Sequence, residues 1–452
     1  RSTPLYSSAA SDVYKRQMYA TTTGAQNTAV GTSALGDNTT GASNVAVGKS
    51  ALAANTTANN NTAIGHNSLA DNTTGSNLVA VGAGALENNT TAAYNVALGK
   101  MVLRFNTTGA GNVGVGYEAL YDNTTGANNS AFGRSAAYNN TTGSNNVAVG
   151  LSSLQDNSTG SNNTSVGKQA MMRNTTASEN TGVGREALFT NTTGSNNIAV
   201  GSAAMYDNTT GSSNTAIGRA ALVHNTTGGD NVALGKSALA DNTTASANTA
   251  VGSNALTNNT TAISNSALGE GALFTNTTGA SNSAFGRSSL YYSTTGANNV
   301  AMGFEALKVN TTGLGNTAVG SRALQSVTTG NNNTCIGRSG GGITTGSSNI
   351  SFGYDVLSGT TTGSKNVYIG QSNGDSGVTG SNNIAIGYHA GRSDSPSGNI
   401  TSNSNRLCLG DNNITNAYIK VDWTVTSDER DKMNFGGVPH GLSFVNDLQP
   451  VK

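Results

Sequence analysis

The sequence predicts an all-β fold, a parallel β-solenoid of the β-roll or β-helix type that is built from 17-residue coils. A glycine that closes an apolar segment recurs at a constant spacing of 17 from Gly31 to Gly337. Each repeat contains one short segment of strand-type alternation and one polar step, usually Asn-Thr-Thr, whose residues favour turns over helix. A leucine-rich repeat or a propeller blade needs a longer period. Stacked coils are therefore the architecture that we expect.

The composition excludes several classes of function. The 452 residues include 23 basic and 23 acidic side chains, so the net charge is zero, which argues against a charge-driven nucleic-acid or membrane-surface binder. No apolar run approaches the roughly 18 residues of a membrane span, so we expect no membrane insertion. The two cysteines, Cys335 and Cys408, cannot form a disulfide framework, and Cys335 is expected in the core.

Each position of the repeat has its own chemistry. Written from its first asparagine, the repeat reads N-x-A-V-G-x-x-A-L-x-x-N-T-T-G-x-x, as in residues 44–60, where alanine replaces the last glycine. The second position is mostly β-branched, the third is small, the fourth is a larger apolar residue and the ninth is usually leucine. We expect the fourth and ninth positions inside the solenoid, which places Val47, Ile64, Leu52 and Leu69 in the interior.

Two columns of asparagine run through the repeats. The first position is asparagine from Asn27 to Asn383 except at Leu78, and the twelfth is asparagine until Ser293 and Val327 interrupt it. One interpretation is structural, since asparagine tolerates left-handed turns and stacked amides can bond from coil to coil. The alternative is that each Asn-Thr-Thr is an N-glycosylation sequon. A glycan on every coil, at about 4.8 Å spacing, would be crowded, which favours the amide ladder.

The position after the motif glycine is often basic, and nearby positions carry acids. The basic residues are Lys49, Lys100, Arg134, Lys168, Arg185, Arg219, Lys236 and Arg287. Such a column could hold an anionic polysaccharide. Recurring aspartates, of which Asp37 and Asp71 are the first, balance the bases and favour a solvated outer face.

The sequence shows no signature of a cofactor site, a metal site or an enzyme that acts on another molecule. The four histidines, His66, His224, His389 and His440, share no metal-ligand spacing. No carboxylate pair stands out from the repeat background, which disfavours a glycan-cleaving site assembled from distant coils. We therefore expect no activity other than the self-cleavage described below.

Free-energy estimates indicate that the coils depend on one another. Burying two large apolar side chains contributes about 3–6 kcal/mol. Ordering 17 residues costs roughly 25 kcal/mol. Neighbouring coils and other chains must supply the difference, so the fibre is expected to be a homotrimer.

The composition divides the chain into five segments. Residues 1–17 carry no repeat, and Asp12 to Gln17 resemble a translated sequencing-library transposon end, so we expect this segment not to be native. Residues 18–26 are a lead-in, and residues 27–410 are the repeat array, whose period becomes irregular after 337. Residues 411–426 are expected to form a terminal β connector that contains Trp423, and residues 427–452 begin a different, truncated domain.

The last segment resembles a known family. The segment resembles the opening of the C-terminal intramolecular chaperone domain of phage tail spikes, tail fibres and endosialidases, on the basis of Ser427, Asp428, Arg430 and Lys432, followed by Gly441, Leu442, Phe444, Val445, Asn446, Leu448, Pro450, Val451 and Lys452. A simpler interpretation of its start is a helix capping box at Thr426 and Glu429.

The resemblance implies a specific assembly and processing step. In that family the domain assembles three chains into a β-helical trimer and then cleaves itself from them. Carried over, the cut lies between Thr426 and Ser427, with Ser427 as nucleophile, Lys432 as general base and Asp428 in support. A lysine can act as a base only where desolvation lowers its pKa.

The repeats are also similar to those of trimeric autotransporter adhesin heads, which are trimers of β-rolls with shorter repeats. Two functions follow from the two resemblances. The first is the structural shaft of a viral (phage) tail fibre or spike for host-surface attachment, and the alternative is a bacterial trimeric surface adhesin or extracellular filament.

The chaperone-like segment favours the viral function. The expected partners are its own copies, a host glycan or protein receptor and other virion tail proteins, with no nucleic acid. The expected location is a virion tail or an extracellular or cell surface.

Overall fold

A computed structural model describes residues 17–357, 359, 362–374, 378–416 and 418. The chain divides into two units, Arg1–Asp411 and Asn412–Lys452. All strands among the described residues belong to the first unit, and none of the described residues is helical. Residues 1–16, most of the expected β connector and the expected chaperone segment lie outside the described residues.

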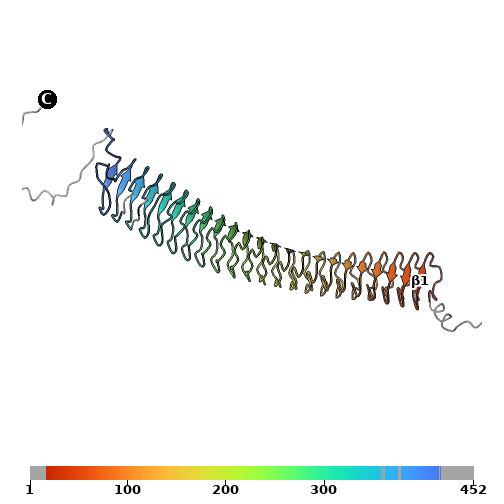
Figure 1. Ribbon diagram of the computed structural model, residues 1–452. Coiled ribbons are helices and arrows are strands. Elements are labelled where there is room, and N and C mark those ends of the chain that lie inside the picture. Colours follow the sequence, from red (N-terminus) through yellow and green to blue (C-terminus); the bar gives the residue numbers. More distant parts are fainter. Residues whose placement is uncertain (1–16, 358, 360–361, 375–377, 417, 419–452) are drawn as a thin grey trace, which may run out of the picture. The chain divides into compact units, whose positions relative to one another are not determined.

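The first unit is a parallel β-solenoid, as the repeat predicts. Its strands form a single row along the stacked coils (Figure 1), and all of the described strands belong to one parallel sheet. The strands are β1 (Thr28–Val30), β2 (Val45–Val47), β3 (Thr62–Ile64), β4 (Val79–Val81), β5 (Val96–Leu98), β6 (Val113–Val115), β7 (Ser130–Phe132), β8 (Val147–Val149), β9 (Thr164–Val166), β10 (Thr181–Val183), β11 (Ile198–Val200), β12 (Thr215–Ile217), β13 (Val232–Leu234), β14 (Thr249–Val251), β15 (Ser266–Leu268), β16 (Ser283–Phe285), β17 (Val300–Met302), β18 (Thr317–Val319), β19 (Thr334–Ile336), β20 (Ile350–Phe352), β21 (Val367–Ile369), β22 (Ile384–Ile386) and β23 (Leu407–Leu409).

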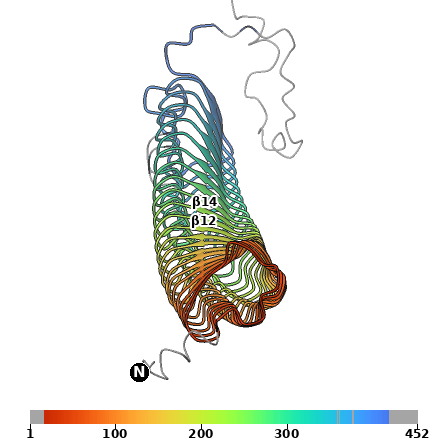
Figure 2. The same ribbon diagram turned by 90° about the vertical axis from the view of Figure 1, so that its right-hand side faces the viewer.

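Each coil pairs with the next at the same repeat position. Ala46 of β2 lies beside Ala29 of β1 and Ala63 of β3, and this register continues along the row. The view along the solenoid shows the coils stacked one over another (Figure 2). At the usual strand spacing of about 4.8 Å, the row of strands is on the order of 100 Å long.

The periodic glycine is required by the close approach of adjacent coils. Gly48 has φ of 137°, and a Cβ atom placed on it would lie 2.4 Å from the carbonyl oxygen of Gly65 in the next coil. Any larger residue would therefore push two coils apart as well as adopt a disfavoured backbone conformation. This contact explains why the 17-residue spacing of glycine is so constant.

The interior contains the third, eighth and ninth repeat positions, so one sequence prediction was wrong. Ala46, Ala51 and Leu52 are fully buried. Leu52 confirms the prediction for the ninth position, and Leu69 is likewise buried. The fourth position points outward instead: Val47 is half-buried and Ile64 is 40% exposed. Successive strand residues face opposite sides, so a buried third residue places the second and fourth outside.

Side-chain volumes in the core compensate for one another. Where the third position is Gly114, a Cβ atom would lie 2.4 Å from Val102 Cγ1 of the preceding coil. Where it is Gly182, a Cβ atom would lie 2.8 Å from Met171 Cγ. Tyr368, the largest core side chain, is accommodated by a glycine six residues later. Such pairing of large with small side chains is typical of close-packed interiors, where a larger side chain at one position requires a smaller one beside it.

Both asparagine columns form buried hydrogen-bond ladders. In the twelfth position, Asn55 Nδ2 donates to Asn38 Oδ1 at 2.8 Å, and the same contact recurs along the array. In the first position, the backbone N–H of Asn44 donates to Asn27 Oδ1 at 2.9 Å. Asn55 is fully buried, as are the other twelfth-position asparagines, so the folded coils have no room for a glycan there. The ladder interpretation is confirmed.

The twelfth-position ladder is broken at Ser293, which leads to a first prediction. The buried Ser293 Oγ and Asn276 Oδ1 atoms have no hydrogen-bond partner. We expect Ser293→Asn to raise the free energy of unfolding by about 1–2 kcal/mol, because its amide would donate to Asn276 and accept from Asn310. Chemical denaturation measures this change. Ser293→Val, which removes the hydroxyl without adding an amide, is the control, and an equal or lower stability of Ser293→Asn than of wild type would contradict the ladder energetics.

Candidate functional site

A continuous uncharged surface consists of the second and fourth positions of β1 to β23, which we call the strand face. Its fourth positions are all Val, Ile, Leu, Phe or Met, and its second positions are all Val, Ile, Leu, Thr or Ser. None of these side chains is charged. Many are exposed, including Val30 (55%), Leu234 (43%) and Leu409 (52%).

The strand face is large enough for a stable protein interface. Single exposed apolar residues are common on protein surfaces, but a continuous apolar row is a mark of an interaction site. Fully burying one such side chain removes roughly 60–120 Å² from water. Fourteen of the 23 fourth-position residues are 37–55% exposed, and the other nine, all valines, are half-buried. The row therefore offers roughly 500–1000 Å², which brackets the ~800 Å² per partner of a standard interface.

A second surface, the turn surface, is formed by repeat positions six, seven, ten and eleven and carries charges and aromatic rings. All eight basic residues predicted there are exposed. Three aromatic pairs from adjacent coils stack on it: Tyr121 with Tyr138 at 4.8 Å between ring centroids, and Phe189 with Tyr206 and Phe274 with Tyr291 at 5.0 Å each.

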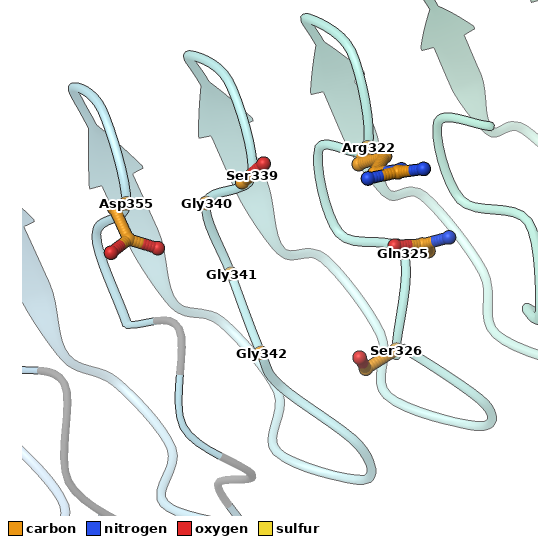
Figure 3. Close-up of a pocket in the computed structure, with 8 residues that line it drawn as sticks. All are labelled: Arg322, Gln325, Ser326, Ser339, Gly340, Gly341, Gly342 and Asp355. Carbon is orange, nitrogen blue, oxygen red and sulfur yellow. The ribbon is translucent and has the colours of Figure 1, made fainter. Parts of the chain in front are cut away.

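Three shallow hollows lie on the turn surface, where glycine replaces a side chain. Figure 3 shows one of them, with Arg322 and Gln325 on one coil, Gly340 to Gly342 on the next and Asp355 on the third. Its volume is about 210 Å³. The other two, of about 120 and 260 Å³, centre on Gly271 and Gly84, each at the seventh repeat position.

Each hollow combines a guanidinium group with a carboxylate. Beside Gly84, Arg104 Nε lies 2.7 Å from Glu87. Beside Gly271, Arg287 lies 3.8 Å from Glu270, and both side chains are about two thirds exposed. Arg322 pairs at 3.2 Å with Glu305. These hollows can offer both hydrogen-bond donors and acceptors to a polar ligand.

The charged network next to the Arg322 hollow is held in its ionised form. Lys308 Nζ lies 2.6 Å from Glu305, and Arg322 lies on the same carboxylate. These two cations lower the pKa of Glu305, with the Lys308 hydrogen bond as the largest cause. The carboxylate therefore stays charged at neutral pH and fixes the position of Arg322.

The histidine and cysteine side chains in the part of the chain that the structure describes lie in small groups or in the core. That part contains no group of three or more His, Cys, Asp or Glu side chains that could hold a metal ion. His224 and His389 pair with single aspartates, Asp207 and Asp394. Cys335 is buried in the core, as expected, and desolvation raises the pKa of its thiol. In these residues we also find no helix of the length and apolar character that crossing a membrane requires.

The predicted self-cleavage residues, Ser427, Asp428 and Lys432, lie outside the described residues, as does His440. The strand face was missed because the fourth position was placed inside. The signal that could have found it is the small third residue between two larger ones. In a three-residue strand the middle side chain points to one face and its two neighbours point to the other. Where only the middle residue is small, that residue faces the tightly packed interior and its two neighbours point outward.

No protein-family model fits the chain, and no curated protein is significantly similar to it.

Proposed function

We propose that the chain is the structural shaft of a trimeric attachment fibre, of the kind found in viral (phage) tail fibres and spikes. The observation that carries this proposal is the strand face, an uncharged apolar row along a solenoid on the order of 100 Å long. A rod with such a surface needs a partner of similar length. Copies of the same chain meet that requirement directly.

Association of three copies also agrees with the thin core. Inside one chain the coil encloses mainly alanine, leucine and asparagine side chains. Much of the larger apolar surface, the valines, isoleucines and phenylalanines of the fourth position, lies outside. A trimer that buries these side chains around a common axis would supply the stability that single coils lack.

In this proposal the C-terminal segment assists assembly. Its resemblance to the intramolecular chaperone of phage fibres gives Ser427, Lys432 and Asp428 the roles described above. The chaperone would bring three chains together and then be removed by the cut between Thr426 and Ser427. A trimer that has lost its folding helper is kinetically stable, because a helper that lowers the barrier to folding also lowers the barrier to unfolding, and the cut removes it.

Attachment to a host surface would use the turn surface. With the strand face buried between copies, the aromatic pairs and the three hollows would stay on the outside of the fibre. Their paired guanidinium and carboxylate groups suit a hydroxyl-rich glycan or a polar protein segment. Other virion tail proteins would bind at the ends of the shaft.

Sedimentation and mass photometry of the intact gene product test the proposal. We expect a particle with the mass of three shafts, elongated and stable on dilution. A stable monomer with the strand face in water would overturn the proposal.

A further inference from the structure

We propose that the hollow shown in Figure 3 is a binding site for a small zwitterion, a molecule that carries an ammonium group and an anionic group a few bonds apart. The hollow is complete within one chain, so binding there goes beyond the proposed function and needs no association of copies. The fold holds two opposite charges on either side of a gap, and these charges carry the proposal.

The gap is made by one shortened coil, residues 333–348, which we call the glycine coil. It has 16 residues, one fewer than the regular repeat, as the pairing of Thr334 with Ile350 shows. Three consecutive glycines, at 340–342, stand where the preceding coil carries alanine, leucine and glutamine. The hollow has a volume of about 210 Å³, against about 30 Å³ for one molecule of liquid water. It therefore has room for a ligand of several heavy atoms.

The opposite charges stand on the two coils that flank the glycine coil. Figure 3 shows Arg322 and Gln325 on the coil before it and the carboxylate of Asp355 on the coil after it. In the other two hollows the acid and the base pair with each other, at 2.7 Å beside Gly84 and at 3.8 Å beside Gly271. Here the glycine coil separates them, so they do not neutralise each other.

The carboxylate of Asp355 is available to a ligand. Asp355 is half-buried, and its carboxylate has no hydrogen-bond or ion-pair partner among the described residues. Arg338, the one base of the glycine coil, lies instead over the ring of Tyr354, 5.9 Å from the ring centroid. A ligand ammonium group would give this carboxylate a charged partner and a hydrogen-bond donor together.

The opposite side of the hollow is fixed in place and offers donors and an acceptor. Arg322 Nε lies 3.2 Å from the carboxylate of Glu305, one coil farther from the hollow. Gln325 Nε2 donates to the same carboxylate at 3.0 Å, which leaves its Oε1 atom free to accept. Because the Glu305 contact uses Nε, the terminal nitrogens of Arg322 can donate to an anionic group of the ligand.

The spacing of the two charges sets the size of the ligand. The coils on either side of the glycine coil are about 9.6 Å apart at the usual strand spacing. Two charge-assisted hydrogen bonds of about 2.8 Å each leave about 4 Å between the charged atoms of the ligand. An α-amino acid or ethanolamine phosphate spans that distance. A diamine or a dicarboxylate would instead place a like charge against one of the two protein groups.

Ligand-observed NMR with the intact gene product tests the site. The zwitterionic probes are free glycine and ethanolamine phosphate. Ethanolamine carries the ammonium group alone, and acetate and inorganic phosphate carry the anionic group alone. We expect both zwitterions to bind at millimolar concentration and each single-charge probe to bind about tenfold more weakly, because one charged contact is lost. Either order of affinity between the two zwitterions supports the site and identifies the preferred anion, a carboxylate or a phosphate.

Three variants locate the binding. Asp355→Asn should weaken the binding of both zwitterions by roughly tenfold to a hundredfold and leave the fold intact, because asparagine tolerates the left-handed backbone at this position (φ 56°). Asp230→Asn changes an exposed aspartate with the same φ outside the hollow, so it is the matched control and should bind as wild type. Ser326→Tyr should abolish binding by filling the hollow, and the coil accommodates it because Tyr292 stands at the same repeat position.

Three results would contradict the zwitterion site. Wild type that binds neither zwitterion would overturn it, as would Asp355→Asn that binds both as tightly as wild type. If ethanolamine alone binds as tightly as the zwitterions, Arg322 contributes nothing and the assigned ligand class is wrong. A monomeric chain that binds both zwitterions would support the site and refute the proposed trimer, so the two failures are distinguishable.

Discussion

Two lysines on the strand face should convert the trimer into a soluble monomer. In the double variant Leu234→Lys and Leu268→Lys, each of two levels would place one ammonium group of every chain in the apolar contact. The wild-type side chains are 43% and 47% exposed in the single chain, so the coil itself tolerates the change. Burying an unpaired charge costs several kcal/mol, and like charges at one level add to that cost. Mass photometry should therefore show the mass of one chain.

A lysine elsewhere in the same repeat provides the control. Leu151 is 41% exposed at the sixth position, where other coils carry Lys100 and Lys168. We expect Leu151→Lys to remain trimeric, and we expect the far-ultraviolet circular dichroism of both variants to match wild type. If the strand-face variant remains trimeric too, the interface lies on another surface.

The sequence predicted the coil and its ladders but not which side of each strand was inside. The 17-residue period can be recognised in the sequence because no residue other than glycine fits at Gly48 and its equivalents, where adjacent coils meet. The asparagine ladder can be recognised because each buried amide needs a hydrogen-bond partner in the next coil, and this requirement keeps asparagine at Asn55 and its equivalents.

The orientation of the strand was misjudged for a physical reason. The usual expectation is that the larger apolar residue, here Val47, lies inside, whereas the smaller residue, Ala46, can be either buried or exposed. A 17-residue coil is narrow, however, and Leu52 already fills it from the turn. Only a small residue, such as Ala46, fits on the strand opposite that leucine. The larger residue is left outside, where another chain can cover it.

The hollows of the turn surface could not be predicted from the repeat. Gly84 and Gly271 stand at the seventh position, which varies freely in the sequence, so a glycine there carries no signal. They create hollows only because side chains of the neighbouring coils stand beside the gap, Asn67 and Met101 at Gly84 and Asn254 and Tyr291 at Gly271. That arrangement depends on the stacking of three coils.

The self-cleavage assignment makes the sharpest prediction about processing. In a gene product that carries the whole chaperone domain, Ser427→Ala and Lys432→Ala should each leave the chain uncut, since one removes the nucleophile and the other its base. Wild type should yield a shaft that ends at Thr426, which mass spectrometry of the intact product detects. Ser443→Ala, a serine of the same segment outside the motif, is the matched control and should be cut normally.

The stability of Ser427→Ala trimers distinguishes the effect of the cleavage from the effect of the chaperone domain on assembly. If the chaperone acts before the cut, Ser427→Ala should still form trimers that carry the uncut domain. Those trimers should unfold and refold more readily than the cleaved shaft, because the attached helper lowers the barrier between the folded and unfolded states in both directions. Cleavage of Ser427→Ala at the same bond would refute the nucleophile assignment, and trimers of equal unfolding half-life with and without the cut would refute the kinetic role of removing the domain.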